Sequence, residues 1–310
     1  NVEPSEAEKR LTPKTSAILM THLFGQTSDV DGFIELASSN NLLLLEDAAQ
    51  ALGASYKNKA AGSFGLASLF SFGLVKNLTT LGGGMVATDD DSLDSALRRI
   101  KYEWAAPDRL SLAKKLGMSL AVKIATGNPF FSFSTYPFLA ALDILHSDLA
   151  DRFFDENPAE LAMTEVPSYM RMDFSPQQAA WGLLQLGKID ESNARRRQNA
   201  LLLRDRLQET KGLGLPEFNE NCVGNHLNFA VRHKNPQQLI RLLRRRGIDS
   251  SVGYLDNCAD SPLFEEYKSD CPVAALLEKE LFYLPIYPAL ERNDIERIAE
   301  AARLVSDELA

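Results

Sequence analysis

The chain has 310 residues, of which 45% are hydrophobic and 24% are charged. This is the composition of an ordinary soluble globular protein, and it excludes a mainly disordered or collagen-like chain. The formal net charge of −9 argues against binding to nucleic acid through a strong overall field. At roughly 100–200 residues per domain, a chain of this length forms about two domains.

The number of cysteines and the composition of the N-terminal residues indicate the cellular compartment. The chain has three cysteines, an odd number with no CxxC spacing: Cys222, Cys258 and Cys271. They are too few for a disulfide framework or a structural zinc site, so we expect a reducing, cytoplasmic setting. Residues 1–15 are polar and charged, unlike a signal peptide. Because there is no initiator methionine, we expect the chain to begin inside a longer protein.

The first hundred residues alternate apolar runs with helical patterns. The apolar runs, which predict short buried strands, are residues 16–23, 42–45, 68–72 and 84–88. One helix is predicted from the N-cap Asp29 to about residue 39, and another over residues 90–104. This alternation predicts an α/β domain with a largely parallel sheet, in which ligands bind at the carboxyl ends of the strands. Asp47 follows the second run and occupies such a position.

Residues 105–165 break this pattern and are predicted to form an insertion. Residues 124–142 are nineteen residues without a charge, close to the length of a membrane span. Gly127, Pro129 and Pro137 interrupt the run, so we expect a buried or interface-forming segment rather than a span. The alternative is a segment on a membrane surface, with head-group contacts from three lysines: Lys114, Lys115 and Lys123.

The C-terminal part is predicted to be a smaller α+β domain. Residues 175–208 have apolar positions three and four apart, which predicts one long amphipathic helix with Arg195–Arg197 on its solvated face. Further elements follow in the order strand, helix, strand and helix, over residues 227–231, 236–246, 249–252 and 293–310. Gly247 is the expected C-cap of the helix over residues 236–246. The predicted limits are therefore 1–104 for the large domain, 105–165 for the insertion and 166–310 for the small domain.

Chemistry-bearing residues gather between positions 46 and 84. Asp47 follows one apolar strand, and Lys76 follows another with few charges near it. A lysine in apolar surroundings has a lowered pKa and can act as a neutral amine nucleophile. A carboxylate, such a lysine and glycine-rich turns together suggest a Schiff-base cofactor site, although a surface lysine has the same local pattern. Gly82–Gly84 are consistent with a tight turn or with phosphate binding.

Several motifs in this stretch occur in a fixed order. They are HLFGQ (22–26), EDAAQ (46–50), GSFG (62–65), FSFGLVKN (70–77) and GGGMVATDD (82–90), followed by MRMDFSPQQAAWGLLQL (170–186) and LPIYP (284–288). With these motifs the chain resembles the DegT/DnrJ/EryC1/StrS family of sugar aminotransferases that depend on pyridoxal 5′-phosphate. The resemblance covers nearly all of the chain except about residues 105–165. It implies a fold-type-I enzyme with a partial large α/β domain and a smaller C-terminal α+β domain.

The resemblance also implies a role for four residues. Lys76 binds the cofactor covalently and then moves a proton between the amino donor and the cofactor. Asp47 pairs with the pyridine nitrogen, Gln50 lies beside it at the phenolic oxygen, and Ser71 donates its hydroxyl to the phosphate. Family members with histidine at the lysine position are dehydratases, so Lys76 favours transamination. The implied reaction moves an amino group from an amino acid, with glutamate expected, to a nucleotide-linked keto-sugar in a homodimer.

The chain departs from the family pattern in two places. Family members begin upstream of Asn1 with a phosphate-binding turn and an aromatic that stacks on the ring, so we expect an N-terminally truncated member. The asparagine that reaches the neighbouring subunit's phosphate is replaced by Tyr169, to which the role is not transferred. His226 and Asn228 either face the substrate or pack in the core.

Three alternatives to the aminotransferase remain open at this point. The chain could be a catalytically incomplete relative that acts as a structural or regulatory subunit. It could be a sugar dehydratase that uses the same cofactor. Residues 124–142 also leave open an enzyme at the membrane surface that acts on lipid-linked sugars.

Overall fold

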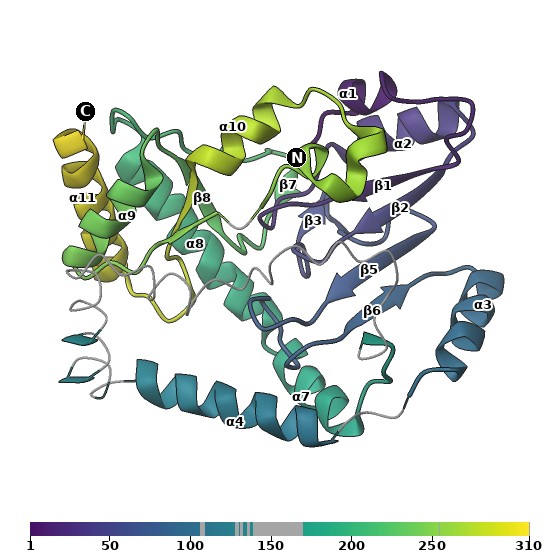
Figure 1. Cartoon of the computed structure of the whole chain (residues 1–310), viewed down its shortest axis with the longest axis horizontal. Helices are drawn as coiled ribbons and strands as arrows, with labels where there is room; N and C mark the ends of the chain where they lie inside the picture. Colours follow the sequence, from purple (N-terminus) through teal and green to yellow (C-terminus); the bar gives the residue numbers. More distant parts are fainter. Residues whose placement is uncertain are drawn as a thin grey trace.

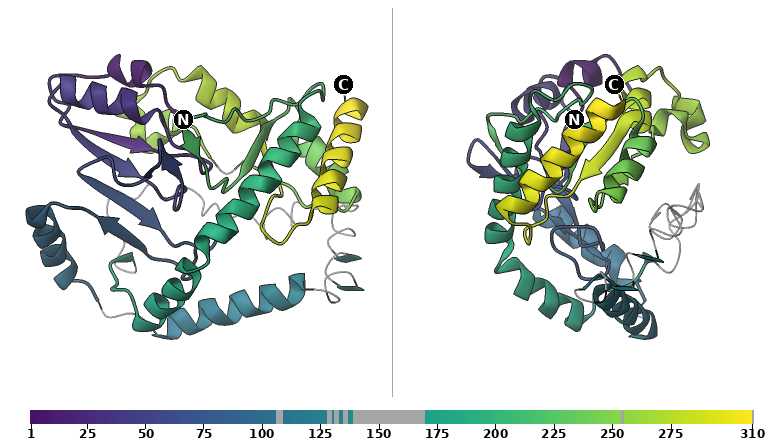
Figure 2. Two further views of the ribbon diagram at one scale, coloured as in Figure 1. Left: turned by 180° about the vertical axis from the view of Figure 1, so that it is seen from behind. Right: turned by 90° about the vertical axis from the view of Figure 1, so that its left-hand side faces the viewer.

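The computed structural model describes residues 1–105, 109–127, 130, 133–134, 137–138, 170–253 and 255–309. Two sheets with their helices form the N-terminal and C-terminal parts, and a pair of successive helices runs between them (Figure 1; Figure 2). The domain limits at residues 104/105 and 165/166 stay predictions, because much of the middle segment lies outside the described residues.

The N-terminal part is built on a four-stranded sheet in the order β1-β2-β5-β6. Its strands are β1 (Ala17–Thr21), β2 (Leu43–Asp47), β5 (Ala67–Ser71) and β6 (Gly84–Ala87). β1, β2 and β5 are parallel, whereas β6 is antiparallel to β5. The sheet is therefore mostly parallel, as predicted, and all four strands coincide with the predicted apolar runs.

Helices accompany this sheet where the sequence places N-caps. α2 (Val30–Ser39) begins after Asp29, whose side chain accepts a hydrogen bond from the Gly32 amide. α3 (Asp91–Tyr102) begins in the same way after Asp90, which accepts from the Leu93 amide. Both helices confirm the predicted starts, and each cap stabilises its helix by about 1 kcal/mol. A short helix, α1 (Pro4–Glu8), precedes β1.

Among the described residues, α2 covers one face of the sheet and the other face is open. Ile18, Met20 and Leu44 point toward α2 and are buried in one cluster with it. Leu19 and Leu43, which point the other way, are 53% and 54% exposed. Residues two apart on a strand share a face, so the open face carries every second residue up to the strand ends.

The two parts of the chain are joined by a short antiparallel sheet in the order β4-β3-β7. β3 (Ser55–Tyr56) and β4 (Lys59–Ala60) follow the end of β2 in the chain, and β7 (Cys222–Val223) precedes the C-terminal sheet. Ser55 pairs with Val223 in this sheet, which fixes the segment after β2 against the C-terminal part.

The single long helix predicted over residues 175–208 is two helices. α7 (Pro176–Leu186) starts with a capping box formed by Ser175 and Gln178. α8 (Ile189–Leu207) follows after Gly187 and Lys188. The backbone of Lys188, with φ −118° and ψ 0°, leaves the helical region there. Glycine is a poor helix former, so α7 ends before Gly187, and the backbone breaks at Lys188 although the apolar spacing continues across both residues.

The arginine run on α8 is also only partly solvated, which corrects the prediction of a solvated face. Arg195 Nε donates to the Pro288 carbonyl at 2.7 Å. Arg196 is half-buried, and burial lowers the pKa of its guanidinium. Arg195 therefore contributes to the contact between α8 and the C-terminal part, and Arg196 is partly shielded from solvent.

The C-terminal part has an antiparallel sheet in the order β8-β10-β9. Its elements are β8 (Phe229–Arg232), α9 (Pro236–Arg245), β9 (Ser251–Val252), the 3-10 turns η3 (Cys258–Asp260) and η4 (Pro262–Tyr267), α10 (Pro272–Glu280), β10 (Leu281–Leu284) and α11 (Arg292–Leu309). The predicted elements at 227–231, 236–246, 249–252 and 293–310 are confirmed. Gly247, with φ 72°, follows α9 as the expected left-handed cap residue.

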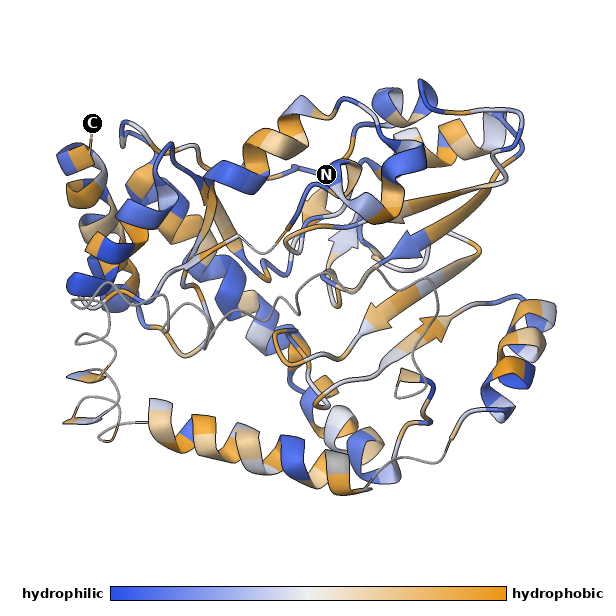
Figure 3. Ribbon diagram, viewed as in Figure 1, coloured by the Kyte–Doolittle hydropathy of each residue, from blue (hydrophilic) through white to orange (hydrophobic). Residues whose placement is uncertain are grey.

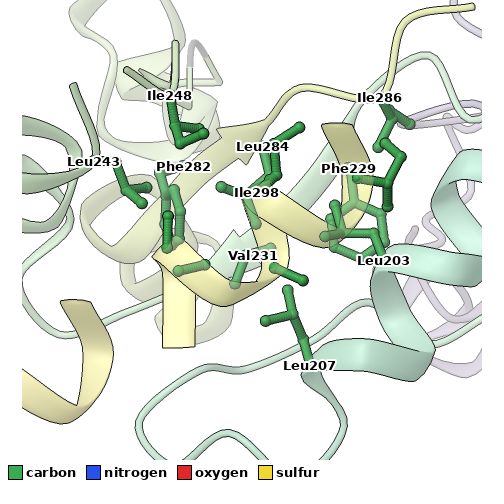
Figure 4. Packing of buried hydrophobic residues seen from close by; sticks show 14 of the residues in the cluster. Leu203, Leu207, Phe229, Val231, Leu243, Ile248, Phe282, Leu284, Ile286 and Ile298 are labelled. Carbon is green, nitrogen blue, oxygen red and sulfur yellow. The ribbon is translucent and has the colours of Figure 1, made fainter. Parts of the chain in front are cut away.

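A core of aliphatic and aromatic side chains holds this part together. Leu203 and Leu207 of α8 meet Phe229 of β8 and Phe282 of β10 in one buried cluster (Figure 4). Each of these side chains is at most 1% exposed. Full burial of one such side chain stabilises the fold by about 1.5–3 kcal/mol. α8 is thereby fixed to the C-terminal sheet.

Among the described residues of the middle segment, α4 (Arg109–Thr126) is a helix that the sequence pattern did not predict. Apolar residues are spread around and along it rather than gathered on one face (Figure 3), and several of them are exposed, such as Leu116, Met118 and Ile124. A helix without a one-sided apolar stripe has no periodic signal. Within the described residues, no helix is both long and apolar enough to cross a membrane. Most of the run 124–142 lies outside the described residues.

Candidate active site

Two of the predicted site residues stand at the ends of neighbouring parallel strands. Asp47 is the last residue of β2 and pairs in register with Leu69 of β5. Ser71 ends β5, two residues beyond Leu69, so its side chain projects to the same face of the sheet as that of Asp47. Asp47 Oδ1 accepts a hydrogen bond from the Ala49 amide at 2.9 Å, which orients the carboxylate.

Lys76 lies on the loop that connects β5 to β6. Phe72 closes this loop: its carbonyl accepts from the amides of Thr80 and Gly82, both at 3.1 Å, and its amide donates to the Gly83 carbonyl at 2.9 Å. Gly82 and Gly83 have φ values of 119° and 96°, which favour glycine. The glycine run therefore forms the tight turn before β6, one of the two interpretations that its sequence allowed.

Three of the four predicted site residues line one hollow in the surface: Gln50, Ser71 and Lys76. The other residues around it come from the same loops and from the start of the C-terminal part: Ala49, Leu52, Asn77, Leu78, Asn225 and Leu227. Asp47 does not line the hollow and stands three residues before Gln50. Asn77 and Asn225 were missed by sequence reasoning, because a single asparagine carries no periodic signal.

Gln50 is held by the loop that follows β1. Its Oε1 accepts a hydrogen bond from the Phe24 amide at 2.8 Å. Phe24 and Gly25 have φ values of 58° and 82°, so this loop turns through the left-handed region. A Cβ at Gly25 would lie 2.0 Å from Asn225 Oδ1, so only glycine fits there. With Oε1 already paired, the amide nitrogen is the part of Gln50 that can donate to a ligand.

A buried hydrogen bond joins His22 to Glu46, the residue directly before Asp47. His22 Nε2 and Glu46 Oε2 are 3.1 Å apart, and both side chains are fully shielded from solvent. The Ser28 amide donates to His22 Nδ1 at 3.1 Å, so the ring proton is on Nε2 and points to Glu46. The sequence singled out both motifs, HLFGQ and EDAAQ, but assigned no role to these two residues.

Glu46 also collects backbone amides from the GSFG turn. Its carboxylate accepts from the amides of Gly62, Phe64 and Gly65 at 2.7, 2.5 and 2.8 Å. Burial acts to raise the pKa of Glu46, but the hydrogen bonds from His22 and the three amides outweigh it, so the pKa lies below its ordinary value. The GSFG turn is thus a carboxylate-binding turn that fixes the end of β2.

Two glutamines of α7 hold the loop that carries Lys76. Gln185 Nε2 donates to the Thr79 carbonyl at 2.7 Å, and its Oε1 accepts from the Thr79 amide at 3.2 Å. Gln178 Nε2 donates to the Thr80 carbonyl at 2.9 Å. The two glutamines are seven residues apart and therefore share one face of the helix. Both glutamines belong to the MRMDFSPQQAAWGLLQL motif. Their spacing of seven residues is the sequence feature from which a shared, loop-binding face of the helix could have been predicted.

His226 and Asn228 line a second hollow together with Phe24, Gln26 and Phe218. His226 is 4% exposed, and its ring centroid is 4.6 Å from that of Phe218. Burial, with a smaller contribution from the charge of Arg197, lowers the pKa of His226 to about 4. Contact of His226 and Asn228 with a substrate stays a prediction. Tyr169, at the position of the family's asparagine, lies outside the described residues.

Comparison with known proteins identifies the family. The model of the DegT/DnrJ/EryC1/StrS aminotransferase family matches residues 1–120 and 153–303. Spore coat polysaccharide biosynthesis protein SpsC of Bacillus subtilis is 28% identical over 316 residues, which cover 98% of this chain and 70% of SpsC. GDP-perosamine synthase of Caulobacter vibrioides is 42% identical over 109 residues, which cover 35% of this chain and 29% of the synthase.

The solved structures agree with this assignment. DesV of S. venezuelae superposes with a TM-score of 0.71 at 26% identity, over 99% of this chain and 69% of DesV. The chain belongs to the DegT/DnrJ/EryC1/StrS aminotransferase family. It is accordingly an enzyme of the fold-type-I class whose cofactor is pyridoxal 5′-phosphate, and these three expectations are confirmed.

Proposed function

We propose that the chain transfers an amino group from an amino acid, with glutamate as the donor, to a keto-sugar attached to a nucleotide. The observation that carries the proposal is the hollow lined jointly by Gln50, Ser71 and Lys76, beside the strand end that carries Asp47. The name GDP-perosamine synthase, which belongs to a relative 42% identical over 109 residues, supports a nucleotide-linked sugar as the substrate class.

The residues around the hollow fit pyridoxal 5′-phosphate. They offer an amine for its aldehyde carbon, a hydroxyl for its phosphate and, at the adjoining strand end, a carboxylate for its ring nitrogen: Lys76, Ser71 and Asp47. Asn77, which also lines the hollow, has a buried Oδ1 atom without a hydrogen-bond partner among the described residues. An unsatisfied buried acceptor at such a place is consistent with a ligand that supplies the missing donor.

When bound, the cofactor supplies an electron-withdrawing ring that stabilises negative charge at the donor's α-carbon. Lys76 would hold the cofactor through its Nζ, and the same amine would hold and move the proton of the donor's α-carbon. The Asp47 carboxylate holds a proton on the ring nitrogen through its negative charge. Ser71 donates to a phosphate oxygen, and Gln50 donates through its amide nitrogen to an oxygen of the ligand.

Trapping of the cofactor tests this proposal. Pyridoxal 5′-phosphate is added to the chain, the product is reduced with borohydride, and the modified peptide is identified by mass spectrometry. The proposal requires the adduct on Lys76 and its loss in Lys76→Ala. An adduct on another lysine contradicts the assignment. Absence of any adduct and of any reaction with glutamate favours a structural or regulatory subunit instead.

We also propose that the active enzyme is a homodimer. The open face of the N-terminal sheet exposes apolar side chains such as Leu19 and Leu43, and large exposed apolar patches mark surfaces that other protein covers. Sedimentation velocity over a range of concentrations tests this. A species of twice the chain mass supports the dimer, and a single monomeric species at all concentrations contradicts it.

A further inference from the structure

Asn193 of α8 joins the two segments that carry Gln50 and Lys76. Its Nδ2 donates to the Leu52 carbonyl at 3.0 Å, and its Oδ1 accepts from Asn77 Nδ2 at 3.0 Å. Leu52 lies two residues after Gln50, and Asn77 directly follows Lys76. Asn193 is 6% exposed, so both hydrogen bonds are shielded from water. A single side chain thus links the two sides of the hollow.

The orientation of both amides follows from the partners. The Leu52 carbonyl can only accept, so the nitrogen of Asn193 faces it. The Asn193 oxygen then faces Asn77 and needs a donor, which places the Asn77 nitrogen toward Asn193. Within the part of the chain that the structure describes, this leaves Asn77 Oδ1 as a buried atom without a hydrogen-bond partner beside the hollow. The bridge therefore determines which polar atom of Asn77 remains for a ligand.

The backbone near Leu52 is shaped for this contact. Gly53 has a φ of 78°, and a Cβ there would lie 2.5 Å from Asn193 Nδ2. Any other residue at position 53 would be strained and would push Asn193 away from the Leu52 carbonyl. Asn225 Nδ2 donates to the same carbonyl at 3.0 Å, so Leu52 is an anchor shared with the start of the C-terminal part.

We propose that Asn193 is a positioning residue that holds the Lys76 and Gln50 segments at a fixed separation. Asn193 is not among the residues that line the hollow, so it acts through Asn77 and Leu52 and not by contact with a ligand. Only the expected effect of Asn193 on cofactor binding rests on the proposed function. The mechanical part, that α8 fixes the Lys76 segment, stands on the hydrogen bonds alone.

Asn199 provides a matched control on the same helix. It is 9% exposed, and its Nδ2 donates to the Tyr287 carbonyl at 3.1 Å and to the Ile286 carbonyl at 3.4 Å. Asn193→Ala and Asn199→Ala each remove a buried amide bonded to a backbone carbonyl, so both lose stability. Only Asn193 contacts the segment next to Lys76.

The experiment measures cofactor affinity by absorbance titration and hydrogen exchange of the amides from Lys76 to Thr80, in both variants. Asn193→Ala should weaken binding of pyridoxal 5′-phosphate about tenfold and speed exchange at these amides, because a buried hydrogen bond to the segment is lost. Asn199→Ala should leave the affinity within about twofold of the parent and leave exchange there unchanged.

Equal effects of the two variants on affinity and exchange overturn the proposal. A double variant, Asn77→Ala with Asn193→Ala, should lose hydrogen-exchange protection of the amides from Lys76 to Thr80 no further than Asn193→Ala alone, because both substitutions break the same bridge. Fully additive losses contradict the bridge. If the parent chain takes up no cofactor at Lys76, the proposed function fails, and hydrogen exchange decides separately whether Asn193 holds the Lys76 segment.

Discussion

His22 Nε2 donates a buried hydrogen bond to Glu46 Oε2, with the two atoms 3.1 Å apart and both side chains shielded from solvent. The pair links the ends of β1 and β2, and the carboxylate also binds three amides of the GSFG turn. Asp47 follows Glu46 directly, so its backbone position depends on this cluster. Hydrogen bonding to the charged carboxylate holds the pKa of Glu46 below its ordinary value, although burial opposes this.

Replacement of Glu46 tests the cluster. Glu46→Gln keeps the size of the side chain but turns an NH₂ group toward backbone donors and removes the charged acceptor of the His22 Nε2–H. We expect a loss of about 3 kcal/mol in the free energy of unfolding at pH 7, measured with urea, because hydrogen bonds to a buried charged acceptor are lost. Glu35→Gln, a change at an exposed carboxylate on α2, should alter it by less than about 0.5 kcal/mol.

The pH dependence of this effect has a definite sign. A carboxyl group with a lowered pKa in the folded state contributes stability above the ordinary carboxyl pKa, and this contribution is lost as the pH falls through the folded value. The difference between the parent and Glu46→Gln should therefore shrink as the solution is acidified below about pH 4.3. A difference that grows with acidity contradicts a charged Glu46 in the folded protein.

His226 should produce a separate pH effect at higher pH. Its folded pKa of about 4 lies below the ordinary histidine value of 6.5, so the unfolded chain binds a proton more readily between these values. Stability should rise with pH across this window, and the folded state should lose about 3 kcal/mol on acidification from 6.5 toward 4. His226→Asn, which tolerates the φ of 47° at this position, should remove this part of the slope. The free energy of unfolding is measured by urea denaturation at each pH. If its dependence on pH is the same in His226→Asn as in the parent, a buried neutral imidazole is contradicted.

The contact between Gly25 and Asn225 predicts a large glycine effect. Gly25→Ala places a Cβ 2.0 Å from Asn225 Oδ1 at a φ of 82°, so we expect a loss above about 3 kcal/mol in thermal or urea unfolding. Gly117→Ala is the control, because a Cβ there has no neighbour within 4 Å. It should be neutral or stabilise α4 by up to about 1 kcal/mol. Similar losses in both variants would contradict the close approach.

Gln185 gives a test of the contact between α7 and the Lys76 loop. Gln185→Ala removes two hydrogen bonds to Thr79 and should cost about 1–3 kcal/mol while making the loop more susceptible to limited proteolysis. Gln177→Ala, on the exposed side of the same helix, should change neither the free energy of unfolding nor the susceptibility of the loop to proteolysis. Equal cleavage of the loop in the two variants would show that α7 does not restrain it.

Strand positions could be predicted from the sequence because each buried strand is a short, continuous apolar run. The direction of β6 could not be predicted, because an apolar run indicates a parallel and an antiparallel strand equally well. The tight turn at Gly82 and Gly83 sets the direction. The break at Lys188 was hidden because apolar spacing continues from α7 into α8. α4 was missed because its apolar residues do not share one face.

The candidate site likewise contains residues that could be predicted from the sequence and residues that could not. Asp47 could be placed because polar residues that end parallel strands lie at one edge of the sheet. Ser71 was singled out only through the resemblance to the family. Asn193 could not be linked to Leu52 or Asn77, because 141 and 116 residues separate them in the chain. Its position depends on the packing of α8 against the C-terminal core, which no local pattern encodes.

The central claim is that Asp47 and Lys76 belong to one aminotransferase site, and the half-reaction with glutamate tests it most directly. The rate of conversion of the enzyme-bound cofactor is measured in a single turnover for the parent and for Asp47→Asn. The variant keeps the shape of the side chain but loses the charge that holds the ring proton. We expect the rate to fall at least about a hundredfold, or roughly 3 kcal/mol of transition-state stabilisation, with a much smaller change in cofactor affinity. Equal rates in the parent and the variant would contradict the account.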